Sequence, residues 1–359
     1  MIRHFFNRAL FLVLFIIPAF FLISLEQKVA AGLSSKDQMR EFIDLTAWYN
    51  SPPIKKKQLE GKVTALVFFD FFSASNIHVT NFLRALQEVY SLSLINWIGV
   101  INPTQPFEDV TYQLGPLKRN RVRIPVAYDG NNRLSTMYGL SVFSKPCILL
   151  FDDRQRLRFT FQDPIDPIEF EKTLRSLILE KFSADDMPYN PVFEKSIPTR
   201  VPTHSYSFNL KYLSGFGNLE PPAYGVAKDY QLSEYLRAHH YYLIGKWTHT
   251  EFSAKNSSTP SSALFLIQSN DFYAILGAAQ SETKKVKVKL DGQWIPNENK
   301  GEDIEIENES SILNVDTPRM FHLVRDLDAK RTHKLELIVD EGEIMIYNAE
   351  EVLEVKSAA

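Results

Sequence analysis

A proline-rich segment, residues 183–204, most constrains how this chain can fold, because it separates two stretches with different hydrophobic patterns. Its prolines stand among polar residues at Pro188, Pro191, Pro198 and Pro202. Proline fixes its own φ and lacks a backbone N–H, so such a segment is typical of a semi-rigid linker. A chain of 359 residues is long enough for about two domains. We therefore expect one domain over 36–182 and a second over 205–356.

The first stretch alternates between patterns typical of strands and of helices. Residues 63–72 (VTALVFFDFF) are apolar and aromatic, as in a strand buried on both faces, and residues 77–91 space their apolar side chains at a helical period. The further expected elements are a helix at 36–48, strands at 95–101, 122–128, 147–151 and 157–161, and helices at 106–118, 134–138 and 167–182. This order predicts an α/β domain with a central mixed sheet, flanking helices and a final antiparallel hairpin.

The second stretch shows short alternating runs without a long helical pattern. Residues 285–290 are the clearest case, since Val286, Val288 and Leu290 alternate with lysines. About eight such runs separated by turn residues predict an all-β sandwich, for which we expect a jelly-roll-like arrangement.

The N-terminus has the layout of a secretory signal. Arg3 and Arg8 precede an apolar run at 9–25, and Val29 and Ala31 satisfy the small-residue rule for cleavage. We expect residues 1–31 to be a signal peptide, with an uncleaved anchor as the alternative. Either predicts an exported protein of a bacterial periplasm or cell envelope. The net charge of −3 provides no basic field for nucleic acid.

Several short motifs, in order, carry a resemblance to a known family. They are WYNSPP at 48–53, QLEGKV at 58–63, FDF at 69–71, SKPC at 144–147, LIGKW at 243–247, VKLDG at 288–292, VDTPR at 315–319, FHLVR at 321–325 and KLEL at 334–337. Residues 48–180 resemble the thioredoxin-like domain of DipZ- and TlpA-type exported disulfide reductases. Residues 205–348 resemble the C-terminal β domain of DipZ-type proteins, which is similar to a carbohydrate-binding module.

The chain departs from this family at the redox site. The resemblance places a Cys-x-x-Cys pair after the first central strand, and the corresponding positions here are Asn76, Ile77, His78 and Val79. Thiol–disulfide exchange needs an attacking and a resolving thiol, and Cys147 is the single cysteine. We expect a redox-inactive domain that requires no cofactor. Without a thiol beside it, we expect His78 to lie exposed at a helix start.

Three further positions are candidates in the first domain. By the resemblance, Asp70 matches a buried acid that moves protons for the cysteine pair, and here we interpret it as structural. Pro146 matches the family's cis-proline, so Lys145 and Pro146 are expected to border a groove for an extended peptide. Cys147 is interpreted as a buried core thiol. A thiol-dependent oxidoreductase that uses Cys147 is the alternative function.

In the second domain, the aromatic residues are candidates for stacking on a sugar. Trp294 follows a turn and is the best surface candidate, whereas Trp247 is interpreted as core. Tyr241 and Tyr242 are also candidates. The lysines of residues 284–289 are interpreted as one solvated strand face. No metal site is expected, because neither His239 and His240 nor Glu220 has a suitably spaced partner.

These expectations combine into one functional hypothesis. The protein is expected to be a non-catalytic binding module of the cell envelope, with a protein or peptide in the groove beside Pro146 and a glycan on the second domain.

Overall fold

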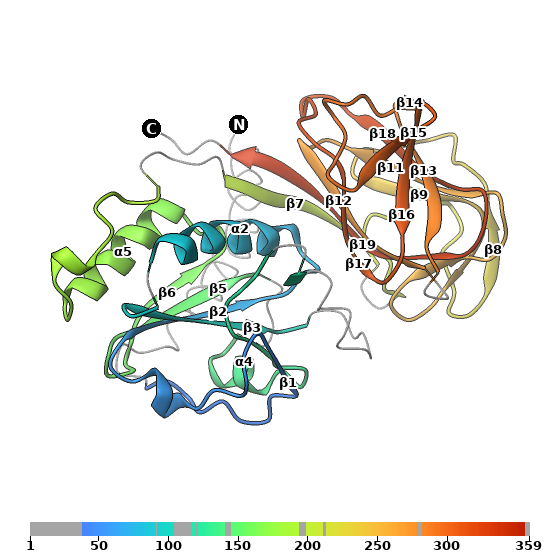
Figure 1. Ribbon diagram of the computed structural model, residues 1–359. Helices are drawn as coiled ribbons and strands as arrows, with labels where there is room; N and C mark the ends of the chain where they lie inside the picture. Colours follow the sequence, from blue (N-terminus) through green and yellow to red (C-terminus); the bar gives the residue numbers. More distant parts are fainter. Residues whose placement is uncertain are drawn as a thin grey trace, which may run out of the picture.

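The computed structural model (Figure 1) describes residues 38–355 except 91, 104–116, 119–120, 141–144, 194–198, 211–212 and 279–281. The expected signal segment, residues 1–31, and most of the expected helix at 106–118 lie outside the described residues. Within the described part of the chain, no helix is both long enough and apolar enough to span a membrane.

The first domain is built on a six-stranded sheet in the order β1-β4-β3-β2-β5-β6. Its strands are β1 (Ala47–Tyr49), β2 (Val63–Phe69), β3 (Ile95–Ile101), β4 (Val126–Tyr128), β5 (Cys147–Phe151) and β6 (Leu157–Gln162). β2 pairs in parallel with β3 and β3 with β4, while β5 and β6 form the expected antiparallel hairpin. Every residue of β2 is buried, as a central strand requires. The predicted mixed sheet and the thioredoxin order of its elements are confirmed.

Helices cover both faces of this sheet. They are α2 (Ala74–Val89), α4 (Arg133–Met137) and α5 (Pro167–Leu179), with short 3-10 helices η1 (Lys56–Leu59) and η3 (Ala184–Asp186). α2 and α5 share one apolar core with the sheet, through side chains such as Phe82 and Phe170. α4 packs on the opposite face through Leu134, in a second core that also contains Cys147. The result is a three-layer α/β/α domain (Figure 1).

One expected helix of the first domain is absent among the described residues. Residues 38–48 run extended, with a β-bridge from Gln38 to Arg156 and with Met39 buried in the core. The backbone of Asp44 takes a positive φ of 58°, which interrupts a helix. The helix prediction at 36–48 was therefore wrong for its described part, because tertiary pairing prevailed over local propensity.

The second domain, here called the β domain, contains the remaining strands. They are β7 (Thr199–Ser207), β8 (Ala227–Tyr230), β9 (His240–His249), β10 (Ala254–Asn256), β11 (Ser261–Ile267), β12 (Asp271–Ala278), β13 (Lys284–Leu290), β14 (Gln293–Trp294), β15 (Ile304–Glu307), β16 (Ser310–Val315), β17 (Arg319–Val324), β18 (His333–Val339) and β19 (Ile344–Val355). All named strand pairs of this domain are antiparallel.

These strands form one sheet that folds over on itself. β9 pairs with β11 through its first half and with β8 and β10, on opposite edges, through its second half, so it joins two layers that enclose a single core. In β13, Val286, Val288 and Leu290 are buried and alternate with more exposed lysines, as predicted. The predicted all-β character is confirmed, but the strand order gives no specific support for the jelly-roll arrangement.

The proline-rich segment is shorter than predicted. β7 begins at Thr199 and pairs along β19, so the β domain begins before residue 205. Pro202 is tolerated because β7 pairs only with β19 and because the register of this pair shifts between Glu351 and Val352. β7 and β19 extend from the β domain alongside α2 (Figure 1). These strands bring the two domains into contact.

Candidate functional site

The position at which the resemblance places a cysteine pair lies at the start of α2. β2 leads through Asp70 and Phe72 to Ser73, the N-cap residue, and α2 begins at Ala74. Asn76 and Val79, at which the resemblance places the two cysteines, are 0% and 3% exposed. The side chains of Ile77 and His78, including the expected exposure of His78, lie outside what the structure describes.

Asp70 has a structural role at this turn. Its Oδ1 atom accepts a hydrogen bond from the backbone N–H of Phe72 at 3.0 Å and another from Nδ2 of Asn76 at 2.9 Å. The carboxyl group is 1% exposed, and a buried carboxyl group needs such partners. Asn76 is therefore a hydrogen-bond donor to Asp70.

A side chain from the β domain completes the start of α2. Oε2 of Glu350 accepts hydrogen bonds from the Ala74 backbone N–H at 2.8 Å and from Ser73 Oγ at 3.4 Å. The first backbone N–H groups of a helix have no partner within the helix, and the helix dipole favours an acceptor there. Glu350 lies on β19 and therefore caps a helix of the other domain.

Apolar contacts surround this cap. Phe72 and Ala74 are buried in one cluster with Tyr273, Ile275 and Met320 of the β domain. The β domain therefore covers the start of α2, the surface where the resemblance places thiol chemistry.

Three carboxyl groups influence one another at the interface. The pKa of Glu350 is raised to about 7, chiefly by burial; the nearby Asp70 and Asp163 contribute to the rise, and the hydrogen bonds from Ala74 and Ser73 oppose it. Burial also raises the pKa of Asp163, whose Oδ2 accepts a hydrogen bond from Ser75 Oγ at 3.1 Å. Burial thus favours the protonated forms of Glu350 and Asp163.

Cys147 packs on the face of the sheet that α4 covers, away from α2. It begins β5, is 3% exposed and packs in the core below the sheet. Burial raises the pKa of its thiol to about 12. A reactive cysteine needs an accessible, low-pKa thiol, so the structure agrees with the interpretation of Cys147 as a core residue.

The expectation of a cis peptide bond at Pro146 was wrong. Among the described residues, cis peptide bonds precede Pro164 and Pro260, and the bond from Lys145 to Pro146 is not cis. The trans form is the more stable one for most X-Pro bonds, so a short motif does not determine the isomer. Lys145 is exposed and Pro146 is buried. The Pro146 carbonyl accepts a hydrogen bond from the Asp163 N–H at 3.3 Å, which places it near Ser75 and α2.

The sugar-stacking candidates are less open than predicted. Trp294 is half-buried, and Nζ of Lys289 lies 5.0 Å from the centroid of its ring. Tyr241 and Tyr242 are buried, as is Trp247, whose interpretation as core is confirmed. Tyr241 packs in the main core of the β domain, whereas Tyr242 packs in a separate cluster with Leu264 and Leu266.

Sequence reasoning missed two groups of residues. Glu350 reaches Ala74 across 276 positions of the sequence, and no local pattern identifies such a pair. The structure also brings His239 together with His204 and Glu351, whereas the candidates His240 and Glu220 do not join that group. The His-x-Tyr pattern of β7 and the paired glutamates of β19 were the available signals.

Comparison with known families gives one match. Residues 209–348 match the family model described as the thioredoxin-like C-terminal domain. This match covers most of the β domain and agrees with the resemblance of residues 205–348. No curated protein matches the chain.

Solved structures align only weakly, with less than half of this chain. A thiol-disulfide isomerase from Corynebacterium glutamicum is 20% identical, with 40% of this chain and 96% of that chain covered and a TM-score of 0.35. A putative thiol:disulfide interchange protein DsbE from Chlorobium tepidum is 16% identical, with coverages of 41% and 99% and a TM-score of 0.33. A secreted disulfide oxidoreductase from Mycobacterium tuberculosis is 12% identical, with coverages of 40% and 97% and a TM-score of 0.30. TM-scores this low carry no argument, so the thioredoxin-like character of the first domain rests on its own strand order.

Proposed function

We propose that this protein is an exported, redox-inactive thioredoxin-like binding protein in which the first domain supports the β domain. One observation carries the proposal: Glu350 and the apolar side chains of the β domain cover the start of α2, where Asn76 and Val79 stand in place of cysteines. An enzyme of this type would need that surface open to a protein disulfide. Export is inferred from the N-terminal segment, and a partner protein of the cell envelope is the proposed ligand.

The test is reduction of insulin disulfides by the purified protein in the presence of dithiothreitol. We expect the rate to equal that of dithiothreitol alone, both for the natural protein and for the Cys147→Ser variant. A thioredoxin measured in parallel shows that the assay works. Reduction above the background that disappears in Cys147→Ser would contradict the proposal and favour the single-thiol oxidoreductase.

Binding of a glycan by the β domain is a second candidate function. Exposed aromatic side chains favour it, since Tyr224 and Tyr235 flank β8 and are 72% and 80% exposed. Flat aromatic faces stack on the apolar faces of sugars. Trp294 is a weaker candidate, because Lys289 covers its ring.

Affinity electrophoresis in gels that contain bacterial cell-wall polysaccharide tests this second function. We expect retardation of the natural protein, a loss of retardation in Tyr224→Ala or Tyr235→Ala, and little change in Trp294→Ala. Equal mobility of the natural protein in gels with and without polysaccharide would contradict glycan binding by the β domain.

A further inference from the structure

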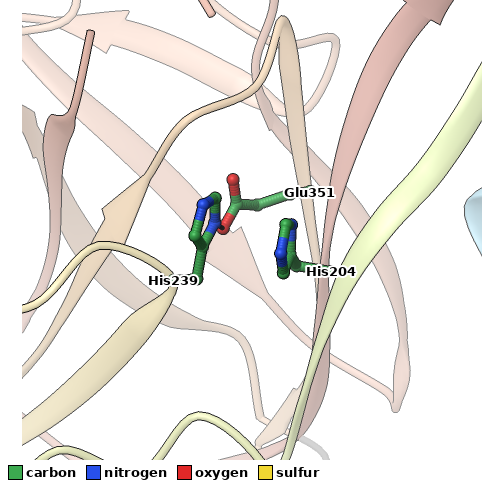
Figure 2. Close-up of side chains that lie close together, drawn as sticks. All are labelled: His204, His239 and Glu351. Atoms are coloured by element: carbon green, nitrogen blue, oxygen red, sulfur yellow. Dashed lines mark hydrogen bonds and ion pairs between the residues drawn. The ribbon is translucent and has the colours of Figure 1, made fainter. Parts of the chain in front are cut away.

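Three side chains with metal-ligating atoms come together beside the second half of β7. His204 belongs to β7, His239 immediately precedes β9, and Glu351 belongs to β19 (Figure 2). One ring nitrogen of each histidine and one carboxylate oxygen of Glu351 lie within 4.8 Å of one another. His204 and Glu351 are directly paired across the two antiparallel strands, so the backbone register holds them on one face.

Glu351 is the buried and oriented member of the group. It is 0% exposed. Its Oε2 atom accepts a hydrogen bond from the Gln268 backbone N–H at 2.7 Å, while Oε1 accepts hydrogen bonds from the Tyr206 hydroxyl and from Nδ1 of His239. A buried carboxylate requires partners of this kind, and metal ligands are commonly oriented by such surrounding hydrogen bonds.

His239 is held toward the carboxylate by its backbone. Its φ of 59° lies in the left-handed region, which is uncommon for a residue other than glycine. Nδ1 of His239 lies 2.9 Å from Oε1 of Glu351. Because an ionised carboxylate only accepts, Nδ1 carries the proton of the neutral ring.

The two imidazole rings are stacked on each other. Their centroids are 3.6 Å apart and their planes differ by 12°. Two imidazolium cations at this separation would repel each other, so the stack fits neutral rings, which is the form that binds metals. His204 is exposed and has room to turn.

We propose that His204, His239 and Glu351 bind one divalent transition-metal ion of the Zn²⁺ class. Two imidazole nitrogens and one carboxylate oxygen form a ligand set that zinc accepts in four-coordinate sites, and they leave a fourth position for water. The ion takes the place of the proton between Nδ1 of His239 and Glu351, and this proton moves to Nε2 of the same ring.

Binding requires a defined local change. A metal ion lies in the plane of each imidazole that ligates it, and two nearly parallel rings do not share such a point. The exposed His204 ring must therefore turn out of the stack. Nδ1 of His239 and Oε1 of Glu351, which are 2.9 Å apart, must separate to about 3.3 Å, the distance expected between two zinc ligands. The bound ion would connect β7, β19 and the start of β9, at the place where the chain enters the β domain.

Metal binding by the purified full chain tests the proposal. The protein is treated with a chelator, dialysed and titrated with ZnCl₂, and Co²⁺ is used as a spectroscopic probe. We expect one ion per chain, a rise in melting temperature and tetrahedral Co²⁺ absorption bands. Absence of zinc binding at 100-fold molar excess, or binding without tetrahedral Co²⁺ bands, would overturn the proposal.

Matched histidine variants locate the site. His204→Gln removes an exposed ligand and should weaken zinc binding by more than about 10-fold, the loss that substitution of an outer-shell residue already produces. His240→Gln changes the adjacent half-buried histidine, whose Nδ1 interacts with the Ala238 carbonyl instead, and should bind zinc as the natural protein does. Equal affinities in the two variants would contradict the proposed site. Melting curves without metal verify that both variants fold.

Discussion

Glu350 on β19 accepts a hydrogen bond from the backbone N–H of Ala74 at 2.8 Å, so a carboxyl group of the β domain caps α2 of the thioredoxin-like domain. The next residue, Glu351, points to the opposite face of the strand and meets the two histidines. Strand alternation thus gives neighbouring glutamates two separate roles.

Glu350 should make stability depend on pH. Its folded-state pKa is raised to about 7 from an ordinary value of 4.5. The protonated folded form therefore contributes stability that is fully present below about pH 4.5 and is lost as the pH rises through about 7, with a total on the order of 3 kcal/mol.

The comparison of the natural protein with Glu350→Gln isolates this contribution. The glutamine carbonyl can still accept from Ala74 but does not titrate. We expect the stability advantage of the natural protein over the variant, measured by urea unfolding, to decrease by about 3 kcal/mol between pH 5 and pH 8. Glu341→Gln, at an exposed position, should show no such change. An advantage of Glu350 that is independent of pH would contradict this role.

Asp70 should matter for folding rather than for catalysis. Asp70→Ala leaves the N–H of Phe72 and the amide of Asn76 without this acceptor inside the protein, which should cost about 2–4 kcal/mol in the free energy of unfolding. The control is Asp166→Ala at the N-cap of α5, where Asp166 accepts from the Ile168 N–H in an exposed setting and the expected cost is about 1 kcal/mol. Equal costs in the two variants would argue against a buried network at Asp70.

Cys147 should resist modification in the folded protein. With a thiol pKa of about 12, about one thiol in 100,000 is ionised at pH 7, and the side chain is buried as well. We expect maleimide to label Cys147 only after denaturation, as followed by mass spectrometry. Rapid labelling of the native protein would support the alternative oxidoreductase.

In both domains, the predictable elements were those whose strands and helices carry strong local patterns. The unbroken apolar run at β2 and the lysine alternation of β13 both specify their structural environment. Position 76 was also informative, since the absence of a cysteine there is visible directly. In these cases the residue pattern within one segment is enough to predict which of its side chains are buried.

Other features depend on distant parts of the chain. β7 forms within a proline-rich segment because β19 offers a long edge on which Pro202 is tolerated. Pro146 takes the trans form, which its motif does not reveal. The capping of Ala74 by Glu350 and the meeting of His204 with His239 follow from tertiary pairing, and the local sequence contains no record of that pairing.

The β domain closes the start of α2, and the accessibility of an engineered thiol measures this closure. In a Cys147→Ser background, Asn76→Cys places a thiol at the first position of the lost pair, and Ser176→Cys places one on the exposed face of α5. If the start of α2 is closed, maleimide should label the Ser176→Cys variant rapidly and the Asn76→Cys variant only after denaturation. Equally rapid labelling of both folded variants would show an open site and would contradict the account.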